Sequence, residues 1–131
     1  MKCIKVFSLT SGNERVITTF EYFKNRVTAE MSDAYEVVKK YPHIGTVKDG
    51  SRLKYAQELD YILNNVLVES ENWEDYVLAY TEKRKIEISA FIDKLPIEDC
   101  VGRCIGLRQA NSLCENIIDE LDKYAKDSYK L

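Results

Sequence analysis

The sequence is short of the residues that interrupt regular structure. Its 131 residues include only two prolines and five glycines, and no unbroken apolar run reaches the about 18 residues that a membrane-spanning helix needs. Together with an apolar fraction of 45%, this shortage excludes a disordered chain and predicts a real hydrophobic core. The length suits a single domain spanning residues 1–131, and no repeat or linker divides it.

Neither sign of charge is in large excess. The chain has 19 Lys and Arg against 22 Asp and Glu, a net charge of −3, which excludes a generally basic nucleic-acid-binding protein but not a local basic patch. Lys2 and Lys5 interrupt the first apolar run, so we expect no secretory signal segment and take cytoplasmic residence as the default.

Histidine is nearly absent. The single residue, His43, lies in the predicted loop 42–50, and the sequence places no carboxylate, nucleophile or metal ligand beside it to make it catalytic. The chain also lacks a glycine-rich phosphate loop, an HExxH pair and a nucleophile elbow. We therefore expect no enzymatic activity and no catalytic residues, and the loop is better suited to contacts.

The four cysteines, Cys3, Cys100, Cys104 and Cys114, are expected to be reduced. Cys100 and Cys104 lie one helical turn apart, but zinc takes four ligands and Cys114 lies about 15 Å further along the same predicted helix. We therefore expect neither a metal nor a cofactor.

Residues 73–95 and 96–125 predict a long antiparallel helical hairpin. The apolar positions of the first arm recur every three or four residues, at Trp73, Tyr76, Val77, Tyr80, Ile88, Phe91, Ile92 and Leu95. Asn72 is a suitable N-cap. Pro96 ends the first helix and suits the first residue of a second one.

The second arm carries a heptad seam. Its members are Cys100, Cys104, Leu107, Asn111, Cys114, Ile118, Leu121 and Ala125, and the stripe is widened by Ile97, Val101, Ile105 and Ile117. Pairing the arms around Pro96 places Phe91 near Cys100, Tyr80 near Asn111 and Trp73 near Ile118. We expect one polar layer, with Asn111 hydrogen-bonded to the Tyr80 hydroxyl or the Arg84 guanidinium, since a buried unpaired amide costs about 1–3 kcal/mol.

Small residues follow one another at intervals of four, at Gly102, Gly106, Ala110 and Cys114. Glycine inside a helix costs about 1 kcal/mol relative to alanine, so this line predicts close approach of another helix, from this chain or from a second copy. The alternative is that Gly102 marks a kink or a delayed start of the helix after Pro96.

Two more helices are expected before the hairpin, at about 19–41 and 52–68. Thr18 and Glu21 fit a capping box for the first, and the alternative is a strand through Phe23 with a shorter helix from Ser32. Ser51 is the candidate cap of the second. Residues 2–10 suit a strand or a helical turn, and with residues 15–19 they could form a small hairpin. The predicted fold is therefore mainly α, a helical bundle built on the hairpin.

We expect a non-enzymatic protein-interaction or assembly module, because tyrosine and tryptophan are enriched at interfaces and the helices have more burying surface than one hairpin can use. The residues expected to contact a partner or a second copy are Trp73, Tyr76, Tyr80, Gly102, Gly106 and Ala110. An acidic face at the open end of the hairpin, formed by Glu71, Glu74, Asp75, Asp119, Glu120 and Asp122, suits a basic partner. The alternative is weak nucleic-acid binding through Lys83, Arg84, Lys85, Arg103 and Arg108.

Residues 73–121 also carry a family resemblance. The motifs are Trp73-x-x-Tyr76, Lys83-Arg84, Leu95-Pro96-x-Glu98-Asp99 and Gly102-Arg103-x-x-Gly106-Leu107-Arg108. They resemble small helical-hairpin proteins of tailed bacteriophages, often encoded near head and portal genes. The resemblance implies an accessory or virion-associated protein that works by contact, in the virion or the host cytoplasm, or equally an inhibitor of a host protein.

Overall fold

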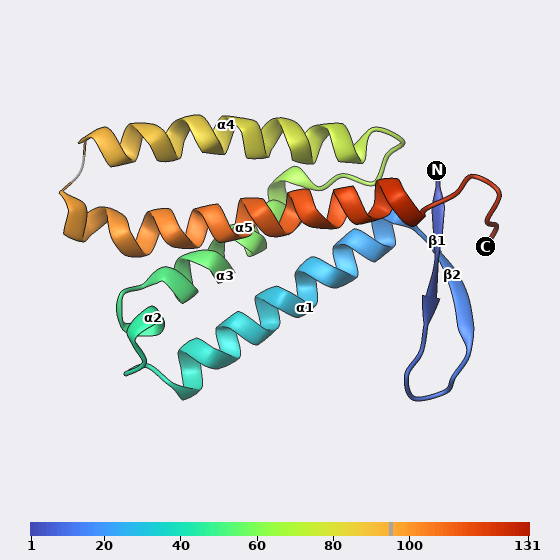
Figure 1. The fold of residues 1–131 in the computed structure, drawn as a ribbon, viewed down its shortest axis with the longest axis horizontal. Helices are drawn as coiled ribbons and strands as arrows, with labels where there is room; N and C mark the ends of the chain where they lie inside the picture. Colours follow the sequence, from blue (N-terminus) through green and yellow to red (C-terminus); the bar gives the residue numbers. More distant parts are fainter. Residues whose placement is uncertain (95) are drawn as a thin grey trace.

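The computed structural model describes residues 1–94 and 96–131, with the main chain alone for residues 97–101. The elements in chain order are β1 (Cys3–Phe7), β2 (Glu14–Thr18), α1 (Thr19–Lys40), α2 (Gly45–Lys48), α3 (Ser51–Tyr61), the π-helical turn η1 (Ile62–Val66), α4 (Trp73–Lys94) and α5 (Ile97–Tyr124). The antiparallel helices α4 and α5 run side by side, α1 and α3 lie across α5, and the β-hairpin stands at the end where both termini lie (Figure 1). The predicted mainly α fold with a small N-terminal hairpin is confirmed.

The seam of α5 is buried as its heptad pattern predicts. Fully or nearly fully buried positions are Cys104, Leu107, Asn111, Cys114, Ile117, Ile118 and Leu121. Three expected stripe members are wrong: Ile105 of α5 is 41% exposed, and Ile92 and Tyr76 of α4 are 45% and 50% exposed. Ile92 and Ile105 lie at the edge of the stripe near the connection between the arms. The predictions for Leu95, Ile97, Cys100 and Val101 lie outside the described residues or side chains.

The line of small residues on α5 packs against α3 of the same chain. A Cβ atom added to Gly102 would lie 1.9 Å from the Asp49 carbonyl oxygen, and one added to Gly106 would lie 2.5 Å from the Ser51 carbonyl oxygen. Ala110 and Cys114 continue the line and are fully buried. The close approach expected from the sequence is therefore made within this chain, and the helix runs through Gly102 without a delayed start.

The predicted helix 52–68 is divided into α3 and η1, and the predicted loop 42–50 contains the short helix α2. Ser51 is not the cap of α3 but its first residue. The Asp49 carboxylate accepts from the Ser51 amide at 2.8 Å, and Gly50, with φ of 85°, makes the turn into the helix. The capping pattern does not predict this arrangement, because the capping side chain lies two residues before the helix.

The helix α1 begins where the capping pattern predicts. Thr18 Oγ1 accepts from the Glu21 amide at 3.1 Å, and the helix continues unbroken past residues 32–33. Phe20 and Phe23 of α1 pack on Trp73 of α4, with ring centroids 6.2 and 5.0 Å apart. These contacts tie the first and fourth helices into one core.

The strands β1 and β2 form an antiparallel hairpin, which decides between the two conformations open to residues 2–10. Their register pairs Cys3 with Thr18 and Phe7 with Glu14. Only the half next to the bundle is packed: Cys3 and Ile4 are buried, whereas Phe7 is 62% exposed. The hairpin is thus anchored at one end and open at the other.

Among the described residues, no helix combines the length and the apolar character needed to cross a bilayer.

Candidate functional site

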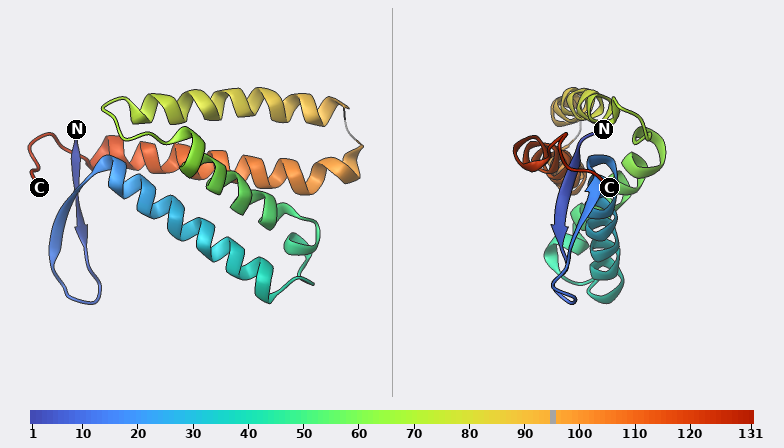
Figure 2. Two further views of the ribbon diagram at one scale, coloured as in Figure 1. Left: turned by 180° about the vertical axis from the view of Figure 1, so that it is seen from behind. Right: turned by 90° about the vertical axis from the view of Figure 1, so that its right-hand side faces the viewer.

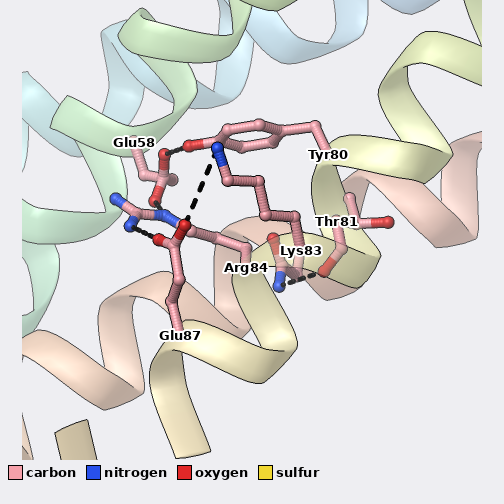
Figure 3. Close-up of polar contacts among 7 residues, drawn as sticks. Glu58, Tyr80, Thr81, Lys83, Arg84 and Glu87 are labelled. Carbon is pink, nitrogen blue, oxygen red and sulfur yellow. Dashed lines mark hydrogen bonds and ion pairs between the residues drawn. The ribbon is translucent and has the colours of Figure 1, made fainter. Parts of the chain in front are cut away.

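The α3–α4 contact contains a buried carboxylate, Glu58, whose side chain is 1% exposed. Its oxygens accept from the Tyr80 hydroxyl at 2.5 Å and from Arg84 Nε at 2.7 Å, and Arg84 also binds Glu87 (Figure 3). A buried charge is tolerated when it is paired and hydrogen-bonded. This group of four residues, the Glu58 cluster, therefore stabilises the helix contact and leaves no unpaired charge.

The pKa values of Tyr80 and Arg84 in the Glu58 cluster, and of Cys114 nearby, are shifted upward. Burial and then the bond to Glu58 raise the pKa of Tyr80. Burial alone lowers the pKa of Arg84, but the hydrogen bond and charge of Glu58 outweigh it and the net direction is upward. Burial first, then Glu58 and Glu115, raise the pKa of the Cys114 thiol to about 12. All three groups stay protonated at neutral pH, so none is an activated base or nucleophile.

The predicted hydrogen bonds of Asn111 are wrong. Its Nδ2 donates to the main-chain carbonyl of Thr81 at 3.4 Å rather than to Tyr80 or Arg84. The physical reason is the third helix: Glu58 of α3 occupies the Tyr80 hydroxyl and the Arg84 guanidinium. The pairing of the two arms alone does not include this helix. Glu58 could have been found, because it lies three residues after buried Tyr55 and four before buried Ile62 on the same face of its helix.

The expected basic residues do not form one patch. Lys83 lies 4.0 Å from Glu87, and Lys85 pairs with Glu115 at 2.8 Å. Arg103 lies over the ring of Phe91, 5.6 Å from its centroid. Arg108 is exposed on the other side of α5, beside a hollow that includes Glu30. Nearby carboxylates thus offset most of this positive charge.

Most of the residues expected to contact a partner are buried within the chain. Trp73 is 1% exposed, so its ring is core and the expectation that it contacts a partner is corrected. Gly102, Gly106 and Ala110 are covered by α3 or the core, which leaves that face closed to a second copy. Tyr80 is bound to Glu58, and only Tyr76, 50% exposed, presents its ring to solvent. Aromatic and small-residue stripes have the same spacing in a core as at an interface.

Part of the expected acidic face is present at the end of the bundle, without Glu120. Glu71, Glu74, Asp75 and Asp122 border a shared hollow, in which burial and then Asp122 raise the pKa of Glu74. Glu120 is directed elsewhere, toward α1. His43 is exposed in the turn before α2, and in the part of the chain that the structure describes no three His, Cys, Asp or Glu side chains are placed to hold a metal ion.

A polar cluster joins α1 to the end of α5 behind the hairpin. The Tyr22 hydroxyl donates to Glu120 Oε1 at 2.6 Å, while Arg26 Nη1 donates to the Tyr22 oxygen at 2.7 Å and to Glu120 Oε2 at 3.1 Å. Burial first and the Glu120 bond second raise the pKa of Tyr22. The cluster holds Tyr22 in one position beneath the hairpin.

Hollows open on two sides of the hairpin around Tyr22. One, of about 510 Å³, runs beside the outer edge of β1 and is lined by Ile4, Lys5, Val6, Phe7, Tyr22, Glu120, Tyr124 and Tyr129. The other, of about 360 Å³ and mostly apolar, lies between the hairpin and α1, bordered by Val6, Ile17 and Ala29. Phe7, 62% exposed, lines both hollows, and Leu9, 95% exposed, follows two residues later in the turn. We call this region the hairpin end.

The hairpin end was not among the predicted sites. The available signal was the apolar content of residues 3–9 just before the turn at residues 11–13, which an ordinary surface turn does not require. Comparison of the chain with protein-family models, with curated proteins and with solved structures finds no match.

Proposed function

We propose that this chain is a non-enzymatic protein-interaction or assembly module, with the helical bundle as the scaffold and the hairpin end as the contact surface. The observation that carries the proposal is the exposure of Phe7, which lines two open hollows, together with that of Leu9 in the adjoining turn. Exposed apolar residues scattered singly need no explanation, but a group of them around a hollow is typical of an interaction site.

Nucleic-acid binding is the weaker candidate. Phosphate contacts need several free Lys or Arg side chains close together. Here Arg84 is bound to Glu58, and Lys83 and Lys85 lie beside carboxylates. The pairing lowers the positive potential along α4, so we favour a protein partner over DNA or RNA.

The resemblance of residues 73–121 to phage helical-hairpin proteins agrees with a protein that acts by contact. On that basis the partner would be a virion component or a host protein, met in the virion or in the host cytoplasm.

The test is affinity capture from the source cells with a C-terminally tagged chain. The double variant Phe7→Ser/Leu9→Ser should lose the specifically bound proteins, measured by quantitative mass spectrometry. The matched control is Ile86→Ser, which removes an equally exposed apolar side chain, 74% exposed, from α4. Equal capture by the hairpin variant and the wild type would contradict the proposed surface.

A further inference from the structure

The strand β1 leaves main-chain groups unpaired on the edge that faces away from β2. Main-chain groups alternate sides along a strand. The Lys2 carbonyl accepts from Thr19 on the opposite strand at 3.0 Å, so the even-numbered residues direct these groups at β2. The N–H and C=O groups of Lys5 and Phe7 therefore point outward, and within the described part of the chain no other element bonds to them.

The same edge already accepts a strand partner at Cys3. The Cys3 amide donates to the Lys126 carbonyl at 3.3 Å, and the Lys126 amide donates back at 2.9 Å, an antiparallel bridge. After Lys126 the tail turns, with the Tyr129 amide donating to the Lys126 carbonyl at 3.4 Å, and the centroid of the Tyr129 ring comes to lie 4.8 Å from Lys5 Nζ. This is a side-chain contact, and among the described residues the tail makes no main-chain hydrogen bond to Lys5 or Phe7. The chain thus pairs the first outward position of this edge and leaves the next two open.

Space is available along the open part of the edge. The 510 Å³ hollow runs beside Ile4 to Phe7. The hairpin stands at the end of the helical bundle, and its loop lies away from both termini (Figure 2). An unpaired strand edge beside a hollow is a site at which an added strand gains main-chain hydrogen bonds.

We propose that the outer edge of β1 pairs with β1 of a second copy of this chain, in an antiparallel two-fold register with Lys5 of each copy opposite Phe7 of the other. Each such pair exchanges both of its main-chain hydrogen bonds. The two open positions of one strand match the two of the other, so no outward group of β1 is left over. The inference rests on the proposed function and names its partner.

Charge complementarity supports a second copy as the occupant. On the outer face of the hairpin, Lys5 stands near one end of the strands and Glu14, opposite Phe7, near the other. An antiparallel arrangement brings Lys5 of one copy across the Phe7 ring toward Glu14 of the second. No like charges stand directly opposite, which strand pairing disfavours, and both exposed Phe7 rings become covered.

The experiment is sedimentation equilibrium of the full chain over a range of concentrations. The wild type should dimerise, and Lys5→Pro should weaken the dimer by about tenfold or more, because it removes an outward N–H without removing a β1–β2 bond. Val16→Pro is the matched control, since it removes an outward N–H from the opposite edge, on β2, and should leave the dimer unchanged. Circular dichroism checks that both variants fold.

A charge exchange tests the register independently of proline. Lys5→Glu and Glu14→Lys should each weaken the dimer, and the double variant should restore it. A monomer at about 1 mM, or a dimer lost with Val16→Pro and not with Lys5→Pro, would overturn the pairing. If the chain is monomeric but still captures another protein through Phe7 and Leu9, self-pairing is wrong and the proposed function stands. A chain that neither dimerises nor captures a protein through Phe7 and Leu9 would overturn both the pairing and the proposed function.

Discussion

The contacts of α3 with α4 and α5 are closely packed, whereas the hairpin end is exposed. Gly102 and Gly106 of α5 lack a Cβ atom, so the start of α3 and the turn before it can approach closely. At the neighbouring α3–α4 contact, both oxygens of Glu58 are bound by Tyr80 and Arg84. At the hairpin end, Phe7 is exposed and the β1 edge beside it is open. This difference is the basis of our proposal that the hairpin end, and not the helical bundle, contacts another molecule.

The largest effect on the free energy of unfolding is expected from removing the buried carboxylate of Glu58. Glu58→Ala leaves Arg84 without its buried partner. Because the Arg84 side chain is 25% exposed, we expect a loss of about 3 kcal/mol in the free energy of unfolding, at the lower end of the range for buried pairs. Urea unfolding measures it. Adding Arg84→Met should recover part of the loss, and a single variant as stable as the wild type would show that the cluster is not stabilising.

The next effect comes from filling the glycine contact. Gly106→Ala places a Cβ atom 2.5 Å from the Ser51 carbonyl oxygen, which is main chain and cannot rotate away. We expect a loss of about 1–3 kcal/mol by thermal or urea unfolding. Gly45→Ala is the control, because nothing lies within 4 Å of the added atom there, and it should be neutral. Equal behaviour of the two variants would contradict the close contact.

Substitutions at the exposed residues of the hairpin end should remove binding and leave the stability nearly unchanged. Phe7→Ser/Leu9→Ser removes two exposed side chains, so the free energy of unfolding should change by less than about 0.5 kcal/mol while binding is lost. Chemical denaturation of dilute protein separates the two properties. A clear loss of stability in the monomer would assign these residues to the fold instead of the contact surface.

The smallest effect is expected at Glu74, at the acidic end of the bundle. Burial, then Asp122, raise the pKa of Glu74, so the folded chain holds this proton more tightly than the unfolded chain. The resulting stability is present below the ordinary carboxyl pKa and is lost as pH rises through the raised pKa.

Glu74→Gln should therefore raise the melting temperature at about pH 7 and change it little at about pH 3. Calorimetry at the two pH values measures this, with exposed Asp33→Asn as the control. A stabilisation that is the same at both pH values would contradict the assigned cause.

Local signals were readable from the sequence, and contacts between distant segments were not. Thr18 caps α1 because its partner amide is three residues away, and the α5 seam follows from its heptads. The spacing of Trp73 fits a core and an interface equally well, so the sequence does not decide between them. Glu58 was overlooked because its partners, Tyr80 and Arg84, lie more than twenty residues along the chain. The hairpin end could not be predicted from the sequence, because it brings together β1, α1 and the end of α5, which are far apart along the chain.

Amide hydrogen exchange at single-residue resolution tests the central claim most directly. As protein concentration rises, the amides of Lys5 and Phe7 should become protected, while that of Val16 on the opposite edge stays fast. The Val6 amide, which faces β2, should be slow throughout. Unchanged exchange at Lys5 and Phe7, with new protection appearing on the outer faces of α4 or α5, would contradict the account.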